Sequence, residues 1–362
     1  MAAGVARPAG TAPEPHARAA LEAWLQKLWF APAGVLDSIA GIVLWPAAAL
    51  VGGVADARRR HIAEARTIPR TPGHPPVVVV GNLVVGGTGK TPLLIALAQA
   101  LAARGWRPGV IARGYGGRAE HGAPAEVLAG STATEVGDEP LLVAQRTGLP
   151  VMVGRDRGAV LDALRRTHDC NVVLSDDGLQ HRGLRRDVEL AVFDARGAGN
   201  GHCLPAGPLR EPLRGALLLD ALVLNGAATV APIVHSRVFR FTIEPTEVIE
   251  LADGRTRPIA EFVASLRGET VDAVAGIGAP ARFFDTLRAI GVPAREHALP
   301  DHSVIDAGWL AGLTGPRIVM TEKDAVKCSG FDPALRARCA ALRVAAVPDA
   351  ALVDWLEERL RG

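Results

Sequence analysis

The fold is decided by the segment VVVVGNLVVGGTGKTP at residues 77–92. Four consecutive valines behind two prolines predict a strand buried on both faces, and the apolar run at 93–101, followed by Gly105, predicts a helix. The glycines between them allow backbone N–H groups to curl around phosphate oxygens at the positive end of the helix dipole. The segment therefore predicts a phosphate-binding loop between a strand and a helix.

Two side chains at the end of this loop add nucleotide chemistry. Lys90 would reach the β- and γ-phosphates, and the Thr91 hydroxyl would ligate Mg²⁺. The full pattern G-x-x-x-x-G-K-[ST] has glycine where this chain has Val84, so an ordinary glycine-rich turn is the alternative. We favour nucleotide binding because lysine followed by threonine after such a loop has a defined mechanism. The residues expected to hold the phosphates are Gly86, Gly87, Thr88, Gly89, Lys90 and Thr91.

Composition narrows the class of protein. A chain of 362 residues exceeds one average domain, so we expect two. The formal net charge of +2 is nearly balanced, and without a basic tract interleaved with aromatics we expect no nucleic-acid partner. The four cysteines form no C-x-x-C pair, which argues against a zinc site or a disulfide scaffold and indicates a reducing cytosolic setting.

The amino-terminal part has a different character. Residues 1–17 are rich in Ala, Pro and Gly and predict a flexible tail. Tryptophans precede an uncharged run at 39–55, and Arg58-Arg59-Arg60 follow it. This run is at the lower limit for crossing a bilayer, so it is a core helix of a soluble domain, an inserted or spanning helix, or an interfacial helix. Indole rings and an arginine cluster at its ends favour the membrane interpretations, with the remaining chain on the cytosolic side.

The rest of the chain predicts two α/β units. Strand-like and helix-like segments alternate over residues 66–234, which predicts a mostly parallel sheet with helices on both faces and ligands at the strand ends. The period changes to two near 238–243, and a turn signal follows, so we expect a two-stranded linker at 235–258. Residues 259–362 predict a smaller α/β domain, and residues 1–65 the tail and membrane-associating segment.

Carboxylates follow two of the predicted strands or loops. Asp176 and Asp177 end an apolar strand, the form of a second phosphate-site motif whose aspartate helps hold Mg²⁺, although an Asp-Asp-Gly turn is the alternative. Asp138 and Glu139 stand before a helix, where capping and catalysis are equally good explanations. His302 lies in a loop, and most lone loop histidines have no special role.

Three loops carry arginines among glycines and prolines. They are residues 113–117 with Arg113 and Tyr115, the triplet at 155–157, and residues 204–214 with Arg210 and Glu211. A solvated loop is the usual explanation for each. In a protein that handles phosphate, contacts to an anionic substrate are the alternative, because guanidinium groups bind phosphate through two parallel hydrogen bonds.

Together these motifs resemble the tetraacyldisaccharide 4'-kinase family, which phosphorylates the lipid A precursor with ATP at the inner membrane of Gram-negative bacteria. The absence of glycine at position 84 is also similar to this family. The resemblance spans most of the chain, and its carriers are GNL at 81–83, GGTGKTP at 86–92, RGYG at 113–116, GDEP at 137–140, SDDGLQH at 175–181, LPAGPLRE at 204–211 and TEKD at 321–324.

The resemblance implies a complete site. It implies that Asp138 and His302 form a dyad that activates the 4'-hydroxyl, that Lys90 and Mg²⁺ stabilise the transferred phosphoryl group, and that the smaller domain closes on the larger. The implied cofactors are ATP and Mg²⁺, the product is lipid IVA, and the enzyme works at the cytoplasmic face of the inner membrane. We expect it to act as a monomer, although the sequence itself does not fix the oligomeric state. The implied metal-site residues are Thr91, Asp176, Asp177 and Glu139, and the implied substrate or phosphate contacts are Arg113, Tyr115, Arg210 and Glu211.

Two other functions are compatible with the motifs. One is a membrane-associated regulatory or assembly ATPase that binds partners, although such proteins often carry a lysine early in the loop where this chain has Gly86. The other is a soluble kinase or ligase acting on a cofactor precursor, with the tryptophan-rich helix in the core. Asn225-Gly226, after a predicted strand, is a candidate for a loop on the nucleotide side of the site.

Overall fold

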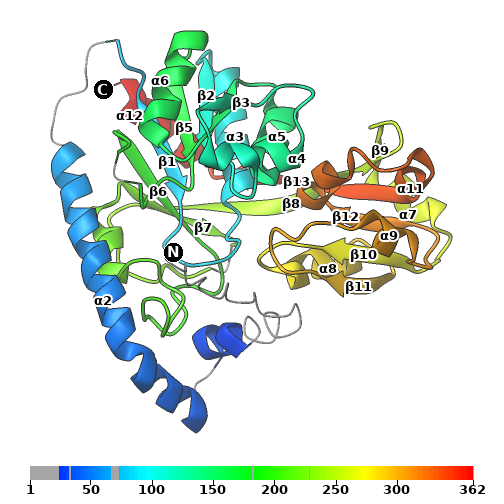
Figure 1. Ribbon diagram of the computed structural model, residues 1–362, viewed down its shortest axis with the longest axis horizontal. Coiled ribbons are helices and arrows are strands. Elements are labelled where there is room, and N and C mark those ends of the chain that lie inside the picture. Colours follow the sequence, from blue (N-terminus) through cyan, green and yellow to red (C-terminus); the bar gives the residue numbers. More distant parts are fainter. Residues whose placement is uncertain (1–23, 32–33, 67–72, 182, 228, 362) are drawn as a thin grey trace, which may run out of the picture.

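The computed structural model describes residues 24–31, 34–66, 73–181, 183–227 and 229–361. The tail expected at residues 1–17 lies outside these ranges. Figure 1 shows a larger and a smaller α/β unit side by side, joined by long strands, with the helix α2 (Val35–Arg66) along the flank of the larger unit. This architecture confirms the predicted fold class, a mostly parallel sheet with a smaller α/β domain attached by a β-ribbon.

The larger unit is built on a parallel sheet in the order β7-β6-β1-β5-β2-β4, with β3 antiparallel at the edge. Because the parallel strands run the same way, their carboxyl ends meet at one edge, where ligands bind in such sheets. The strands are β1 (Val77–Gly81), β2 (Pro108–Ala112), β3 (Ala125–Glu126), β4 (Val151–Val153), β5 (Val172–Asp176), β6 (Val188–Phe193) and β7 (Ala221–Asn225).

Helices cover both faces of this sheet. Val78 and Val80 of β1 face a core that includes α3 and α5, whereas Val77 and Val79 face a core that includes α6 and part of α2. All four valines are buried, which explains the run of β-branched residues, since a central parallel strand has no solvent face. The helices of this unit are η1 (Arg118–His121), α3 (Lys90–Ala103), α4 (Ala133–Val136), α5 (Asp138–Thr147), α6 (Arg157–Thr167) and η2 (Leu213–Leu218).

The smaller unit has a parallel sheet of its own, in the order β11-β10-β12, with an apolar core on each face. Its strands are β10 (Val271–Ala275), β11 (Ala294–Ala298) and β12 (Ile318–Thr321), and its helices are α7 (Ile259–Ser265), α8 (Pro280–Ala289), α9 (Ala307–Ala311), α10 (Glu322–Ala325), η3 (Val326–Cys328) and α11 (Pro333–Arg338).

The ribbon that joins the units differs from the expected two-stranded linker at 235–258. β8 (Val238–Glu250) does pair with β9 (Thr256–Pro258), but its main partner is β13 (Cys339–Pro348), which runs antiparallel to it from Phe241 to Glu250. β8 also pairs in parallel with β7 of the larger unit, and β13 with β12 of the smaller one. One continuous sheet therefore crosses both units. The pairing of β8 with β13 joins segments that are far apart in the sequence, so the local sequence pattern could not predict it.

The end of the chain also differs from the expected division, which placed 259–362 in the smaller domain. α12 (Ala350–Arg361) packs on the larger unit, in the same core as α3 and β1 (Figure 1). Its buried residues include Leu352, Leu356 and Leu360, at the spacing of one helix face. The reason is topological, because β13 carries the chain back along the ribbon before α12 begins.

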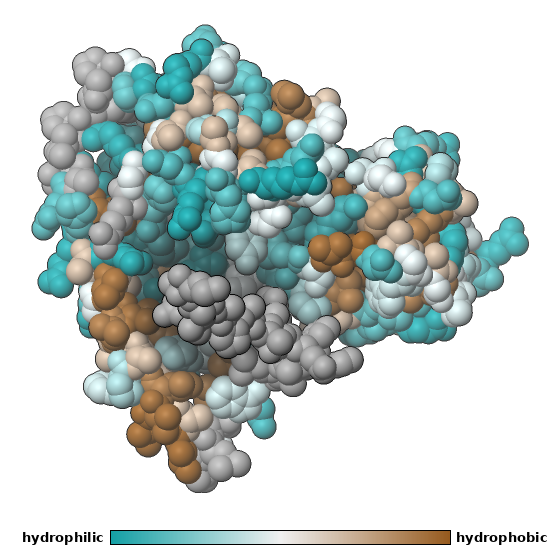
Figure 2. Space-filling model, viewed as in Figure 1, coloured by the Kyte–Doolittle hydropathy of each residue, from teal (hydrophilic) through white to brown (hydrophobic). Residues whose placement is uncertain are grey.

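The helix α2 continues past the apolar run at 39–55 and through the arginine cluster. Residues 39–64 are long and apolar enough to cross a membrane. Only 11% of the most apolar 18-residue stretch of this segment is buried inside the protein. Ile42, Val43 and Leu50 are each more than 70% exposed, and Figure 2 shows the hydrophobic surface along this helix. This exposure disagrees with the interpretation of α2 as a core helix of a soluble domain.

Candidate active site

The phosphate loop connects β1 to α3, as the sequence predicts, and its shape is held by two asparagine side chains. The Asn82 amide nitrogen donates to the carbonyls of Val84 (2.6 Å) and Gly86 (3.2 Å), and the Asn225 amide donates to the Thr88 carbonyl (3.0 Å). Gly89 has φ of +92°, which favours glycine, and a Cβ there would meet the Asn225 amide at 2.6 Å. The helix that starts at Lys90 therefore presents its amino end to the loop, where a phosphate group binds favourably.

Asp177 lies directly beside this loop. Its carboxylate accepts hydrogen bonds from Arg210 at 2.7 and 3.0 Å and lies 3.8 Å from the Lys90 ammonium. Burial raises the pKa of Asp177, but the charges of Lys90 and Arg210 outweigh burial and lower the pKa to about 2. Asp177 is therefore ionised throughout the physiological range and holds both cations beside the loop.

Asp176 has a different environment, although it is the next residue in the chain. It ends β5 opposite Val80 of β1, it is buried, and its Oδ1 has no hydrogen-bond partner in the described part of the chain. Burial and the nearby Glu139 carboxylate raise the pKa of Asp176 to about 7, against the charge of Lys90. A buried carboxylate oxygen without a partner next to a phosphate loop is suited to a cation.

These residues fit a magnesium ion held together with nucleotide phosphates. Within the described ranges, no group of three or more His, Cys, Asp or Glu side chains is arranged to hold a metal by itself. Mg²⁺ is typically bound by one or two carboxylates together with substrate phosphates and water. Asp176 and Thr91 line the same cavity and supply the two kinds of oxygen that such a site needs.

The structure brings Asp138 and His302 together, although they come from different units. Asp138 is the first residue of α5, and His302 lies in the loop after β11, with its Nδ1 3.2 Å from both carboxylate oxygens. Burial raises the pKa of Asp138, but the hydrogen bond from His302 and the charges of Lys323, His302 and Lys327 lower it to about 2. Burial lowers the pKa of His302, but Asp138 outweighs burial and the pKa lies above its usual 6.5.

Two lysines of the smaller unit fasten it to the acidic first turn of α5. Lys323 Nζ lies 2.9 Å from Glu139 Oε1, 3.0 Å from Asp301 Oδ1 and 3.3 Å from His302 Nε2. Lys327 Nζ lies 3.5 Å from Asp138 Oδ2. Burial lowers the pKa of Lys323, but the surrounding carboxylates, Glu139 first, raise it above its usual value. The acidic first turn of α5 is thus both the helix start and the contact surface for the smaller unit.

One cavity of about 1560 Å³ contains these groups and extends between the two units. Gly86 to Thr91, Asp176 and Asp177 line it from the larger unit, and His302 and Lys323 from the smaller one. At the wall of the cavity the backbone of the smaller unit at Gly278 lies close to the phosphate loop at Gly87. A Cβ on Gly278 would come within 2.3 Å of the Gly87 nitrogen. The phosphate loop and the Asp138–His302 pair therefore open into a common space.

Comparison with known proteins gives the family. A family model described as tetraacyldisaccharide-1-P 4'-kinase matches residues 40–361. The chain belongs to this family. A tetraacyldisaccharide 4'-kinase of Azotobacter vinelandii is 46% identical over 88% of this chain and 92% of the relative, and one of Pseudomonas aeruginosa strain LESB58 is 46% identical over the same shares. The solved structure of LpxK from Aquifex aeolicus in complex with ATP covers 88% of this chain and 99% of its own, with a TM-score of 0.71 and 26% identity.

In this member of the 4'-kinase family, the four expected substrate or phosphate contacts lie in different places. Arg113 and Tyr115 line the cavity. The Tyr115 ring packs edge-on against the His302 ring, with 4.8 Å between the ring centroids. Arg210 lines it too, beside Asp177. Glu211 differs from the prediction: it is 3% exposed, does not line the cavity and pairs with Arg59 of α2. The Arg210 backbone N–H donates to the Leu83 carbonyl, the Arg210 side chain binds Asp177, and the Glu211 side chain binds Arg59.

Three residues in and around the candidate site had no role assigned from the sequence. Asn82 braces the loop, Lys323 joins the units, and Arg59 holds Glu211. Asn82 and Lys323 stand inside the motifs that carry the family resemblance, which is the only sequence signal for them. Arg59 has no such signal, because it stands between two other arginines.

Proposed function

We propose that this chain transfers the γ-phosphoryl group of ATP to the 4'-hydroxyl of a tetraacyldisaccharide-1-phosphate, giving lipid IVA. Membership of the 4'-kinase family supports an ATP-dependent kinase of lipid A biosynthesis and disfavours the regulatory ATPase. The observation that carries the proposal is that the Asp138–His302 pair and the phosphate loop open into one cavity. Because one chain supplies all of these groups, we propose that it acts as a monomer.

The dyad supplies the proton acceptor. A hydrogen bond from Nδ1–H to Asp138 leaves the Nε2 lone pair of His302 as the acceptor for the 4'-hydroxyl proton. The Lys323 ammonium lies near Nε2 in the ligand-free structure. When the substrate hydroxyl takes its place beside Nε2, Lys323 still pairs with Glu139 and Asp301. Asp138, with its pKa near 2, stays ionised and stabilises the imidazolium formed on proton transfer.

The phosphate side of the reaction is electrostatic. Lys90 and the amino end of α3 stabilise negative charge on the transferred group, and Arg210 adds a further cation beside them. Mg²⁺, when bound by Asp176 and Thr91, would neutralise charge on the β- and γ-phosphates.

The Asp176→Asn substitution tests the magnesium site. We expect the half-saturating Mg²⁺ concentration to rise by about 10- to 100-fold, as for other losses in metal coordination shells. In the absence of Mg²⁺ and nucleotide, the same variant should unfold at a higher temperature than wild type at pH 8. The reason is that a raised pKa means the ionised carboxylate destabilises the ligand-free fold above its unfolded pKa.

The matched control is Asp272→Asn in the smaller unit. Asp272 is also buried, but it is paired with His297 and Arg295, and its pKa is lowered rather than raised. This variant should unfold at a lower temperature and keep the Mg²⁺ dependence of wild type. A drop in unfolding temperature for both variants, with unchanged Mg²⁺ dependence, would contradict the assignment of Asp176.

We also propose that α2 docks on the cytoplasmic face of the inner membrane and places the cavity at the level of the lipid headgroups. The support is the row of exposed apolar side chains on the first half of α2, together with a tetraacyl substrate that stays in the bilayer. A chain held at that surface meets its substrate at a higher local concentration.

The double substitution Ile42→Asp/Leu50→Asp tests this docking. Each side chain contributes roughly 1.5–3 kcal/mol when it leaves water, so binding to phosphatidylglycerol vesicles should weaken by more than about 100-fold. Co-sedimentation with vesicles measures this, and Leu128→Asp, at an exposed leucine of the larger unit, serves as the matched control. Unchanged sedimentation of the double variant would refute docking through α2.

A further inference from the structure

Arg59 is buried, although it stands in an arginine cluster at the end of an apolar helical segment. Arg58 and Arg60 are exposed, as expected of a positive cluster at a membrane boundary, whereas Arg59 is 2% exposed. The helix α2 turns this one side chain into the larger unit. A guanidinium without solvent needs anionic partners inside the protein.

Two buried carboxylates meet this need. Arg59 Nε and Nη2 donate to the two oxygens of Glu211, each at 2.8 Å, and Nη1 donates to Glu189 Oε1 at 2.8 Å. Glu211 is 3% exposed and Glu189 is 1% exposed. Burial lowers the pKa of Arg59, but the hydrogen bonds and charges of these carboxylates raise it above its usual value. The Arg59 guanidinium is therefore a permanent positive charge that joins two buried carboxylates, and it is the cation paired with Glu211 in the described part of the chain.

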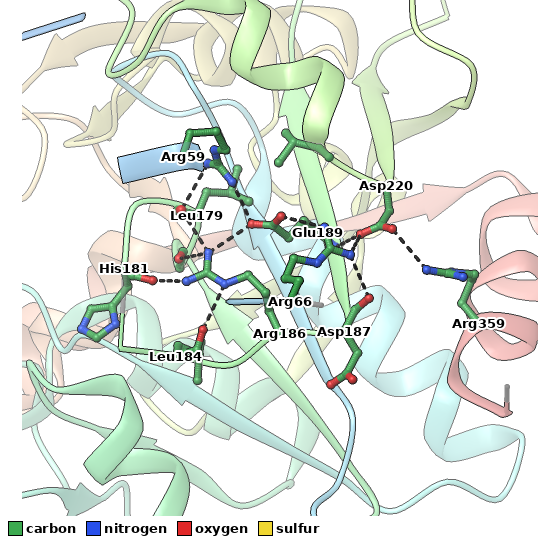
Figure 3. A network of polar contacts seen from close by, with 12 residues as sticks. Arg59, Arg66, Leu179, His181, Leu184, Arg186, Asp187, Glu189, Asp220 and Arg359 are labelled. Atoms are coloured by element: carbon green, nitrogen blue, oxygen red, sulfur yellow. Dashed lines mark hydrogen bonds and ion pairs between the residues drawn. The ribbon is translucent and has the colours of Figure 1, made fainter. Parts of the chain in front are cut away.

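The same network holds the loop that follows the two active-site aspartates. Arg59 Nη2 also donates to the Leu179 carbonyl at 3.2 Å, and Figure 3 shows Arg186 reaching the same region. Arg186 donates to the carbonyls of Gly178 and Leu179 at 3.1 and 3.0 Å and pairs with Glu189. The turn directly after Asp177 is thus fixed by two buried arginines that share one carboxylate.

Glu211 extends the connection to the phosphate loop. Gln180 donates to Glu211 Oε1 at 2.8 Å and to the Asn82 carbonyl at 3.2 Å. Asn82 in turn braces the loop through Val84, and the residue before Glu211 is Arg210, which holds Asp177. A chain of hydrogen bonds therefore runs from α2 to Asn82 on one side of the phosphate site, and the backbone joins Glu211 to Arg210 on the other.

We propose that Arg59 is a positioning residue that couples the membrane-docking helix to the phosphate-transfer site, by fixing Glu211, the turn after Asp177 and the start of the phosphate loop. This inference rests on the proposed kinase function for its effect on turnover. α2 is then a wall of the active site as well as a docking element. A displacement of α2 would move the groups that hold the nucleotide phosphates.

The proposal changes how a truncation of α2 is interpreted. A deletion of residues 1–60 removes Arg59 and leaves Glu211 and Glu189 without one of their cations. Lost activity in such a deletion therefore does not report lost membrane contact alone. The substitutions at Ile42 and Leu50 keep Arg59 and separate the two effects.

The test compares Arg59→Gln and Arg59→Lys with Arg60→Gln, in detergent-dispersed lipid where docking does not limit the rate. Arg60 is exposed and does not line the cavity, whereas Arg58 does. We expect Arg59→Gln to lower kcat/KM for ATP by about 100-fold, because a small misplacement of reacting groups has an effect of that order. Arg60→Gln should remain within about twofold of wild type, since a solvated surface charge contributes little. Vesicle binding by Arg59→Gln should stay close to wild type, which a simple loss of attachment would not produce.

Arg59→Lys keeps the buried charge and protects the fold if Arg59→Gln does not fold. A single ammonium cannot reproduce the forked contact, so we expect kcat/KM for ATP to fall at least about 10-fold while the unfolding transition stays cooperative. A folded Arg59→Lys variant with wild-type kinetic constants and wild-type ATP affinity would overturn the proposal. ATP affinity is measured with a fluorescent ATP analogue in the absence of lipid, so this measurement does not depend on the identity of the acceptor lipid. A failure of the Arg59 proposal can therefore be distinguished from a failure of the proposed kinase function.

Discussion

Substitution of His302 by alanine is expected to lower kcat by about 10²–10⁴, the usual contribution of a positioned general base. In the proposed mechanism the His302 Nε2 is the proton acceptor, and Asp138 holds the Nδ1 at 3.2 Å, so Asp138→Asn should have an effect of similar size. KM for ATP should stay within about twofold, because neither residue belongs to the phosphate loop. Steady-state kinetics with detergent-dispersed lipid and varied ATP measure both constants.

The chain contains a matched control for this pair. His297 lies 2.8 Å from Asp272 in the same unit, in a second Asp–His contact that does not line the cavity. His297→Ala should leave kcat close to wild type, even if it lowers stability. Turnover near wild type in both His302→Ala and Asp138→Asn would remove the dyad from the mechanism.

The pH profile gives an independent check of the same pair. A base must be neutral to accept a proton, and the pKa of His302 is raised, so activity should fall as the pH drops through a value above 6.5. Asp138, with its pKa near 2, stays charged over this range. In Asp138→Asn the acidic limb of the residual activity should shift to a lower pH, because the charge that raises the His302 pKa is gone. An acidic limb at an unchanged pH would contradict this assignment.

Substitution of Lys90 by alanine is expected to lower kcat/KM for ATP by at least about 10²–10³, the range seen when one preorganised charge is removed from a transition-state site. The fold should survive, because Asp177 keeps its two hydrogen bonds with Arg210 when Lys90 is removed. Circular dichroism and the unfolding temperature check the fold, and phosphate transfer measures the loss.

Lys27→Ala is the matched control for Lys90. Lys27 is an exposed lysine of the short helical segment at 24–30 and does not line the cavity. This variant should retain wild-type transfer. A Lys90→Ala variant that stays folded and retains more than about a tenth of wild-type transfer would show that the loop does not act on the phosphates as proposed.

Local sequence determined much of the fold. The valines of β1, the glycines of the loop and the helix from Lys90 are close in the chain, so their pattern predicts their structure directly. The two aspartates could be placed at a strand end for the same reason. Their opposite environments could not, because burial and the distance to Glu139 or Arg210 depend on how distant segments pack.

Contacts between remote segments explain what the sequence did not predict. β13 returns along β8 and carries α12 to the larger unit, which no local period encodes. Among three adjacent arginines, only the direction of each side chain from α2 distinguishes Arg59, and that direction is set by tertiary packing. The partnership of Asp138 with His302 came from the family resemblance, since the residues alone gave no reason to join them.

The most direct test of the account is transfer of γ-labelled phosphate from ATP to a detergent-dispersed tetraacyldisaccharide-1-phosphate, with a lipid-free control and Lys90→Ala in parallel. The account predicts a labelled lipid that carries the new phosphate at the 4'-position, formed by wild type and lost in the variant. ATP binding or hydrolysis by wild type without any labelled lipid would contradict it and would favour an ATPase that acts on partners.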